Sequence, residues 1–274
     1  MIKTLRFLSL ATCLATVGFP AAHAFAEFED GWRAYQKGDF TAALNEWRPL
    51  ADKGNSLAAY NLGVMYDEGR GVAQDTEQAM LWWRKAAENG HARAQHNLGL
   101  AYITGKEMSQ DYAKAVSWLE KAANQGLIRS QYSLGKMYAS GLGVAKDEKK
   151  SFYWIHKAAQ EGFVKAQYNL GKMYRDGTGV DEDRRASAEW FLAAARQGYD
   201  KAQNHIGVRL AKGDGIEKDE TRALKWLILA ANQGLARAAE NRDSLAKTLS
   251  PEQRKEAERL AREWKPEKTS ARTY

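Results

Sequence analysis

The sequence predicts an all-α fold: a right-handed α-solenoid of tandem antiparallel helix pairs, closed by capping helices at each end. Three residue types recur with a step of 36 residues, and a fixed step of this length is typical of repeat proteins. The glycines are Gly54, Gly90, Gly126, Gly162, Gly198 and Gly234; the aspartates are Asp75, Asp111, Asp147, Asp183 and Asp219; the tryptophans are Trp82, Trp118, Trp154, Trp190 and Trp226. Because all three keep one register, we predict five full repeats: 55–90, 91–126, 127–162, 163–198 and 199–234.

Each repeat reads as two helices joined by a glycine turn. Apolar residues at helical spacing predict the buried face of the first helix: Ala58, Ala59, Leu62, Met65 and Tyr66. Gly69 and Gly71 then form the turn, and Asp75 is expected to cap the second helix, with Gln78 completing a capping box. A second apolar stripe follows at Ala79, Trp82, Trp83, Ala86 and Ala87. Gly90 is expected to end the helix in the left-handed conformation.

A glycine inside every first helix lowers helix propensity by about 1 kcal/mol. These glycines are Gly63, Gly99, Gly135, Gly171 and Gly207. We interpret them as sites where a neighbouring helix or tryptophan ring approaches closely. The tryptophans themselves keep helical register, which favours a core position over a sugar-stacking surface.

The ends of the array differ from its middle. Residues 27–54 resemble a shorter helix pair in which Asp39 keeps the 36-residue register, and they are expected to form an N-terminal capping repeat. Residues 235–264 are expected to form C-terminal capping helices, the last opened by Ser250, Pro251 and Gln253. We expect Leu260 and Trp264 to pack that helix on the array, and residues 265–274 to be disordered.

Residues 1–24 read as a secretory signal peptide. Lys3 and Arg6 precede an apolar run over residues 7–17, which is too short to span a bilayer, and a small-x-small site ends at Ala24. Cleavage is expected after Ala24, with Ala26 as the second choice; a lipoprotein signal ending at Cys13 is the alternative. The mature chain is then periplasmic or secreted, with no cysteine and no expected transmembrane segment.

Composition and spacing favour a non-enzymatic protein without cofactor or metal. The formal net charge of the whole chain is +7; the signal contributes Lys3 and Arg6, and the remaining +5 is spread through the units, so no nucleic-acid-binding stripe is indicated. His91 and His96 are five residues apart and do not share a helix face as a metal pair would. The repeated G-x-G lacks the strand and lysine of a phosphate-binding loop, and no catalytic carboxylate pair is visible.

The candidate binding surface is the inner face lined by first helices. One slot of the repeat holds Asn61, Asn97 and Asn169, with Ser133 and His205 as its variants, and Lys136 and Lys172 follow one turn later. Asparagine could hydrogen-bond an extended peptide backbone, and lysine could bind a carboxylate. The alternative is that the asparagines satisfy neighbouring groups of the fold and the lysines are solvated.

The full pattern resembles Sel-one-like repeats, relatives of tetratricopeptide repeats. In the first repeat, one set of residues carries it: Ala58, Leu62, Gly63, Tyr66, Gly69, Gly71, Val72, Asp75, Ala79, Trp82, Ala86, Ala87 and Gly90. The main departure is Lys106-Glu107-Met108 in the second repeat, where the turn must find another conformation or store strain. The resemblance implies an interaction scaffold or regulator in the bacterial periplasm that binds a protein or peptide. The alternative is a protein associated with peptidoglycan or polysaccharide, or active on β-lactams. Neither the partner nor the oligomeric state follows from it.

Overall fold

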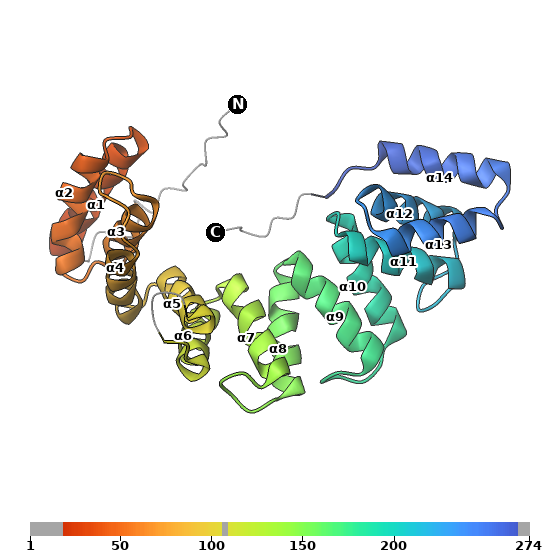
Figure 1. Ribbon diagram of the computed structural model, residues 1–274, viewed down its shortest axis with the longest axis horizontal. Coiled ribbons are helices and arrows are strands. Elements are labelled where there is room, and N and C mark those ends of the chain that lie inside the picture. Colours follow the sequence, from red (N-terminus) through yellow and green to blue (C-terminus); the bar gives the residue numbers. More distant parts are fainter. Residues whose placement is uncertain (1–18, 106–108, 268–274) are drawn as a thin grey trace. The chain divides into compact units, whose positions relative to one another are not determined.

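The computed structural model describes residues 19–105 and 109–267, and all of their regular secondary structure is helical (Figure 1). The helices are α1 (Phe19–Gln36), α2 (Phe40–Asp52), α3 (Ser56–Glu68), α4 (Thr76–Glu88), α5 (Ala92–Thr104), α6 (Tyr112–Asn124), α7 (Ile128–Ser140), α8 (Glu148–Gln160), α9 (Val164–Asp176), α10 (Arg184–Arg196), α11 (Asp200–Lys212), α12 (Glu220–Asn232), α13 (Ala236–Ala246) and α14 (Pro251–Glu263). Each repeat contributes one odd-numbered first helix and one even-numbered second helix. The chain is therefore an all-α solenoid of helix pairs, as the 36-residue register predicts.

The described residues form two compact units. The first runs up to Ala101, and the second comprises residues 102–105 and the chain from Ser109 onward. The departure of the second-repeat turn falls on residues 106–108, which lie outside the described residues. So does most of the expected signal peptide, residues 1–18, although α1 extends across the expected cleavage position at Ala24.

The N-terminal capping pair packs through residues that follow that cleavage position. Phe28 is buried and stacks on Trp47 of α2, with ring centroids 5.7 Å apart. The Trp47 indole Nε1 also donates a hydrogen bond to the Phe28 carbonyl, at 3.2 Å. These contacts between Phe28 and Trp47 involve only residues that would remain after removal of residues 1–24.

Aspartate caps begin the second helices, as predicted. The Asp75 carboxylate accepts a hydrogen bond from the Gln78 backbone N–H at 3.0 Å, and the other periodic aspartates do the same three residues ahead. The prediction of a capping box at Gln78 is wrong, because this residue contributes its backbone N–H and not its side chain to the cap. A complete box is formed by Ser250 and Gln253 at the start of α14.

The first-helix glycines do mark close helix packing. A Cβ at Gly171 would lie 2.9 Å from the Phe191 ring, and one at Gly63 would overlap the Trp83 ring. The partner is therefore the residue after the periodic tryptophan, because helix geometry turns that position toward the facing helix. Of the periodic tryptophans themselves, Trp82, Trp154 and Trp226 are buried, whereas Trp118 and Trp190 are half-buried.

The glycine turns join successive repeats. Gly179 has a φ of +72°, and a Cβ there would collide with the carbonyl oxygen of Glu148, the first residue of α8. Gly143 makes the same approach to Tyr112, and Gly215 to Arg184. Each turn thus rests on the start of the second helix one repeat earlier, where a side chain has no space.

A buried glutamine also links successive repeats at one fixed position. The Gln167 amide nitrogen donates a hydrogen bond to the Ala159 carbonyl near the end of α8, at 3.3 Å. Gln203 makes the same bond to Ala195. The same two carbonyls, in the last turns of α8 and α10, also accept hydrogen bonds from the backbone N–H groups of Gly162 and Gly198, so each glutamine adds a side-chain donor from the next repeat.

The C-terminal helix packs back on the array partly as predicted. Trp264 lies edge-on to Trp226, with ring centroids 5.9 Å apart, and contacts the core cluster around Phe191 and Ile206. Leu260 is only half-buried; the buried side chains of α14 are Ala257 and Ala261.

The first three residues of the segment expected to be disordered, 265–274, are ordered against the array. Residues 265–267 lie against the end of α10, where the Glu267 backbone N–H donates a hydrogen bond to the Arg196 carbonyl at 2.8 Å. Contact with Gly198, beside which Pro266 packs, holds this segment in place. The remaining residues, 268–274, lie outside the described part of the chain.

Candidate partner-binding face

The first helices of the second unit are α7, α9, α11 and α13, and polar side chains join them one to the next. The Asn169 amide nitrogen donates a hydrogen bond to the Tyr132 hydroxyl at 3.1 Å, which links α9 to α7. His205 Nε2 lies 3.5 Å from the Tyr168 hydroxyl, which links α11 to α9. Asn241 repeats the arrangement with Asn204, at 2.8 Å. We call the surface around this ladder the first-helix face.

This ladder shows what the periodic asparagine slot does in the fold. Asn169 satisfies a neighbouring hydroxyl, which is the structural alternative considered for it from the sequence. Burial raises the pKa of the Tyr132 hydroxyl, while the hydrogen bond with Asn169 partly opposes that shift. The ladder therefore links successive first helices of the second unit.

The predicted site residues divide between the two units. Asn61 lies on α3 and Asn97 on α5, both half-buried and both in the first unit. Lys136 is exposed on α7. The structure brings together the other three, Asn169, Lys172 and His205, on the neighbouring helices α9 and α11.

His205 is a half-buried side chain with several cations around it. Its ring stacks on Phe191 with centroids 4.6 Å apart and an interplanar angle of 7°. Burial is the largest cause that lowers its pKa to about 4, and the positive charges of Arg175, Arg209, Lys172 and Arg237 lower it further. The imidazole is therefore neutral at neutral pH and is surrounded by cations from α9, α11 and α13.

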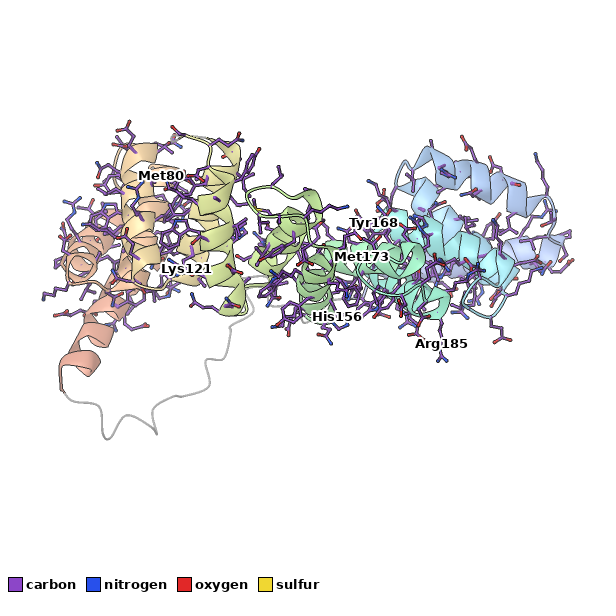
Figure 2. The ribbon with its side chains drawn as sticks, turned by 90° about the horizontal axis from the view of Figure 1, so that it is seen from below. Met80, Lys121, His156, Tyr168, Met173 and Arg185 are labelled. Carbon is purple, nitrogen blue, oxygen red and sulfur yellow. The ribbon has the colours of Figure 1, made fainter. Side chains whose placement is uncertain are left out.

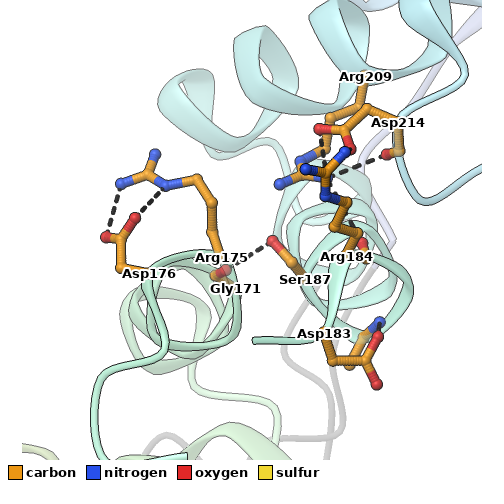
Figure 3. A network of polar contacts seen from close by, with 9 residues as sticks. Gly171, Arg175, Asp176, Asp183, Arg184, Ser187, Arg209 and Asp214 are labelled. Atoms are coloured by element: carbon orange, nitrogen blue, oxygen red, sulfur yellow. Dashed lines mark hydrogen bonds and ion pairs between the residues drawn. The ribbon is translucent and has the colours of Figure 1, made fainter. Parts of the chain in front are cut away.

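Two of these cations are already paired (Figure 3). Arg175 binds the neighbouring Asp176 through two hydrogen bonds of 2.7 and 2.8 Å. Arg209 is only 6% exposed and pairs with Asp214 at 2.9 Å, while its guanidinium lies over the Phe191 ring. It also donates to the Arg184 carbonyl. Arg209 therefore acts within the fold, holding the glycine turn of the fifth repeat against α10.

The first-helix face is separate from the side formed by the second helices. Figure 2 places Tyr168 of α9 toward one edge of the second unit, and His156 of α8 and Arg185 of α10 toward the opposite edge. Tyr168 packs edge-on against Tyr199, with ring centroids 5.1 Å apart, so an aromatic contact holds this ladder residue in position.

The sequence interpretation missed a column of cations one turn before the ladder. It consists of exposed side chains at the second residue of each first helix of this unit: Arg129, Lys165, Lys201 and Arg237. Their spacing of 36 residues was available in the sequence, but the surrounding charges concealed it there. None of the four makes an ion pair with any residue that the structure describes.

Neither a metal site nor a membrane span is found in residues 19–105 and 109–267. Within these ranges, no three histidine, cysteine or acidic side chains come close enough to hold a metal ion. The helices described there are also too short or too polar to cross a lipid bilayer.

The matches to known families follow the helix pairs. The Sel1 repeat model matches five consecutive segments: 56–91, 92–127, 128–163, 164–199 and 200–235. Together they make up more than half of the chain. The chain belongs to the Sel1 repeat family. The matched segments keep the step of 36 residues and begin one residue later than the repeats marked from the sequence.

Two solved structures support the same family. The protein c5321 of uropathogenic Escherichia coli, a protective antigen with an SLR fold, is 32% identical with a TM-score of 0.74; the similarity covers 89% of this chain and 54% of that one. A Sel1 repeat protein from Oxalobacter formigenes is 30% identical with a TM-score of 0.69, over 86% of this chain and 96% of that one. The chain therefore spans about half the length of the E. coli structure.

A shorter match involves one repeat and a half. The rat protein DAP3-binding cell death enhancer 1 is 39% identical over 51 residues, which are 19% of this chain and 10% of that protein. Such a short segment supports the repeat type, and it carries no argument about the activity of this Sel1 repeat chain.

Proposed function

We propose that this Sel1 repeat protein is a non-enzymatic interaction scaffold that binds a protein or peptide partner on the first-helix face of its second unit. Sel1 repeats generally serve as protein-interaction scaffolds. The observation that supports this face is the combination of a polar ladder with exposed cations on neighbouring helices. Lys136 is exposed there, and Lys172 lies within electrostatic range of His205 and Asp176.

A stacked helix array suits this role physically. Packing between neighbouring repeats holds the first helices in register, so the binding groups need little ordering when a partner arrives. The aromatic contacts of Tyr132 with Phe163 and of Tyr168 with Tyr199 stiffen the face from within. The groups on this face that take no part in these aromatic contacts are the cationic side chains and the side-chain oxygen of Asn169.

The proposed compartment is the bacterial periplasm or the medium outside the cell. This part of the proposal rests on the N-terminal sequence: two basic residues, an apolar run and a small-x-small site that ends at Ala24. The absence of cysteine after Cys13 is compatible with an oxidising compartment, because no thiol can mispair there.

Site-specific photo-crosslinking tests the face directly. A photoreactive amino acid is placed at Lys172 on the first-helix face or, as the control, at Tyr153, which is 49% exposed on α8. Each protein is produced in its own host and irradiated in the intact cell envelope. We expect a discrete protein adduct from position 172 and little adduct from position 153. Equal adducts from both positions would contradict the proposed face. Recovery of glycan fragments alone would favour the envelope-polymer alternative.

A further inference from the structure

The cation column on the first-helix face has a regular geometry that restricts its ligand. Arg129, Lys165, Lys201 and Arg237 occupy the same position of four successive first helices. Each precedes a ladder residue by three or four positions, which is about one helical turn, and residues so spaced lie on the same side of a helix. The column therefore runs across the helices and parallel to the ladder.

Opposing charge is scarce beside this column. In α7, α9 and α11, the acidic residues are Asp176 and Asp200, and Asp176 is neutralised by Arg175. Basic residues outnumber them on every one of these helices. Charge complementarity therefore favours an anionic ligand, and it is strongest over α7, α9 and α11.

The ladder beside the column is neutral and can form hydrogen bonds. Asn169 uses its amide nitrogen for Tyr132, and its oxygen accepts no hydrogen bond from the residues described. Asp200 of α11 and Glu240 of α13 form no ion pair with a described residue, unlike Asp243 of α13, which pairs with Arg242. Asp200 and Glu240 would repel a ligand that carries negative charge at every position. A peptide with carboxylates at intervals and backbone amides between them fits this alternation better than a uniformly charged polymer does.

The spacing of the helices sets the spacing of the carboxylates. Side chains of neighbouring first helices meet directly, as the Asn169–Tyr132 bond shows. Closely packed helices have axes about 8–10 Å apart; these first helices meet through the ends of long side chains, so their axes lie at about 10 Å or more, and an extended chain advances about 3.3 Å per residue. One acidic residue in about three would therefore meet successive cations.

We infer that the first-helix face of the second unit binds an extended acidic segment of a partner protein, with a carboxylate at about every third residue, on the column of Arg129, Lys165, Lys201 and Arg237. This inference rests on the proposed function and specifies the chemistry of the partner. The binding is electrostatic in large part, so it weakens as salt screens the charges.

Fluorescence anisotropy with synthetic peptides tests this assignment. The probe is a labelled peptide of about ten residues with glutamate at every third position, and the comparison peptides have the same glutamates clustered at one end or replaced by glutamine. Each is titrated with the purified protein, the Lys165→Glu/Lys201→Glu variant and the Lys149→Glu/Lys255→Glu variant. Lys149 on α8 and Lys255 on α14 are exposed outside the column, so both variants change the net charge equally. Thermal unfolding followed by circular dichroism verifies that all three proteins fold.

We expect the unmodified protein to bind the spaced peptide more tightly than either comparison peptide. The affinity for the spaced peptide should fall about tenfold or more in the column variant and by about twofold or less in the control variant. Equal losses in both variants would show that net charge alone attracts the peptide and would overturn the inference. So would equal affinity for the clustered peptide. If polyphosphate bound more tightly than the spaced peptide and lost affinity in the column variant, the ligand of the column would be a phosphate polymer and the inferred acidic peptide would be wrong.

The photo-crosslinking experiment separates failure of this inference from failure of the proposed function. A protein adduct at position 172 whose crosslinked segment lacks acidic residues would leave the scaffold function standing and overturn the inferred partner chemistry. Absence of any adduct at position 172 would contradict both.

Discussion

Gly179 in the turn of the fourth repeat lies directly against the backbone carbonyl of Glu148, at the start of the second helix one repeat earlier. The turn holds this position with a φ of +72°, and a Cβ has no space there. Two demands thus fall on one residue: a left-handed backbone and the absence of a side chain. This contact between repeats explains why the second glycine of the turn recurs at Gly143 and Gly215.

Substitution of Gly179 by alanine should destabilise the second unit by about 2–4 kcal/mol. The left-handed backbone costs an alanine about 1 kcal/mol, and the collision with Glu148 forces a shift of the turn that costs more. Urea unfolding monitored by circular dichroism gives the change. Gly126→Ala is the matched control, because Gly126 has a φ of +85° with no atom near the added Cβ, and we expect it to cost about 1 kcal/mol. Equal effects of the two substitutions would contradict the contact.

Substitution of Gln203 by alanine should lower stability by about 1–3 kcal/mol, because it removes two hydrogen bonds made by a buried side chain. The Gln203 side chain is fully buried; it donates to the Ala195 carbonyl at 3.3 Å and accepts from Gln233 at 2.8 Å. Gln110→Ala provides the comparison: that side chain also bonds a backbone carbonyl, at 2.7 Å, but it is exposed. We expect the control to change stability by less than about 0.5 kcal/mol. A Gln203 variant as stable as the Gln110 variant would show that the hydrogen bonds of the buried glutamine contribute little.

Stability should fall as the pH drops from about 6.5 toward 4, in part through His205. The folded pKa of about 4 lies below the ordinary value of 6.5, so the unfolded chain takes up the proton first. This contribution is complete above pH 6.5 and is lost as the pH approaches 4. It amounts to about 1–2 kcal/mol, since solvent screens part of the shift at a half-buried ring.

The comparison for this pH effect is His205→Asn, which places the residue of Asn169 in the same slot. Arg175, Arg209, Lys172 and Arg237 disfavour the imidazolium, while Asp176 lies within range and opposes them weakly. Unfolding measured at pH 7.5 and pH 5 should show a smaller difference for the variant than for the unmodified protein. An unchanged difference would assign the pH dependence to other groups, such as His91, whose pKa is also lowered to about 4.

The exported protein should begin at Phe25. Signal peptidase needs small residues at the positions occupied by Ala22 and Ala24, so Ala22→Leu/Ala24→Leu should retain the precursor. Mass spectrometry of the N-terminal peptide distinguishes the outcomes. A start at Glu27 would indicate the second site, after Ala26, and a lipid-modified Cys13 would indicate a lipoprotein. An intact Met1 in the unmodified protein would contradict export by this route.

Local chemistry that repeats along the chain was readable from the sequence. The 36-residue step identified every helix pair from α3 to α12, because each pair repeats the same apolar stripes. The aspartate caps at positions such as Asp75 followed from the same register, since capping involves residues only three apart. Ser250 and Gln253 formed their box for that reason as well.

Relationships between helices required the tertiary structure. Helix facing decided that Gly63 meets Trp83 and not the periodic Trp82, a choice that depends on how one helix is rotated against another. The packing of neighbouring repeats places Asn169 within hydrogen-bond distance of Tyr132, 37 residues earlier. Arg129, Lys165, Lys201 and Arg237 lie on one face and form no ion pair with any residue in the described part of the chain. A one-dimensional pattern shows which residues recur, but only packing in three dimensions shows which of them are satisfied within the fold and which remain exposed to a partner.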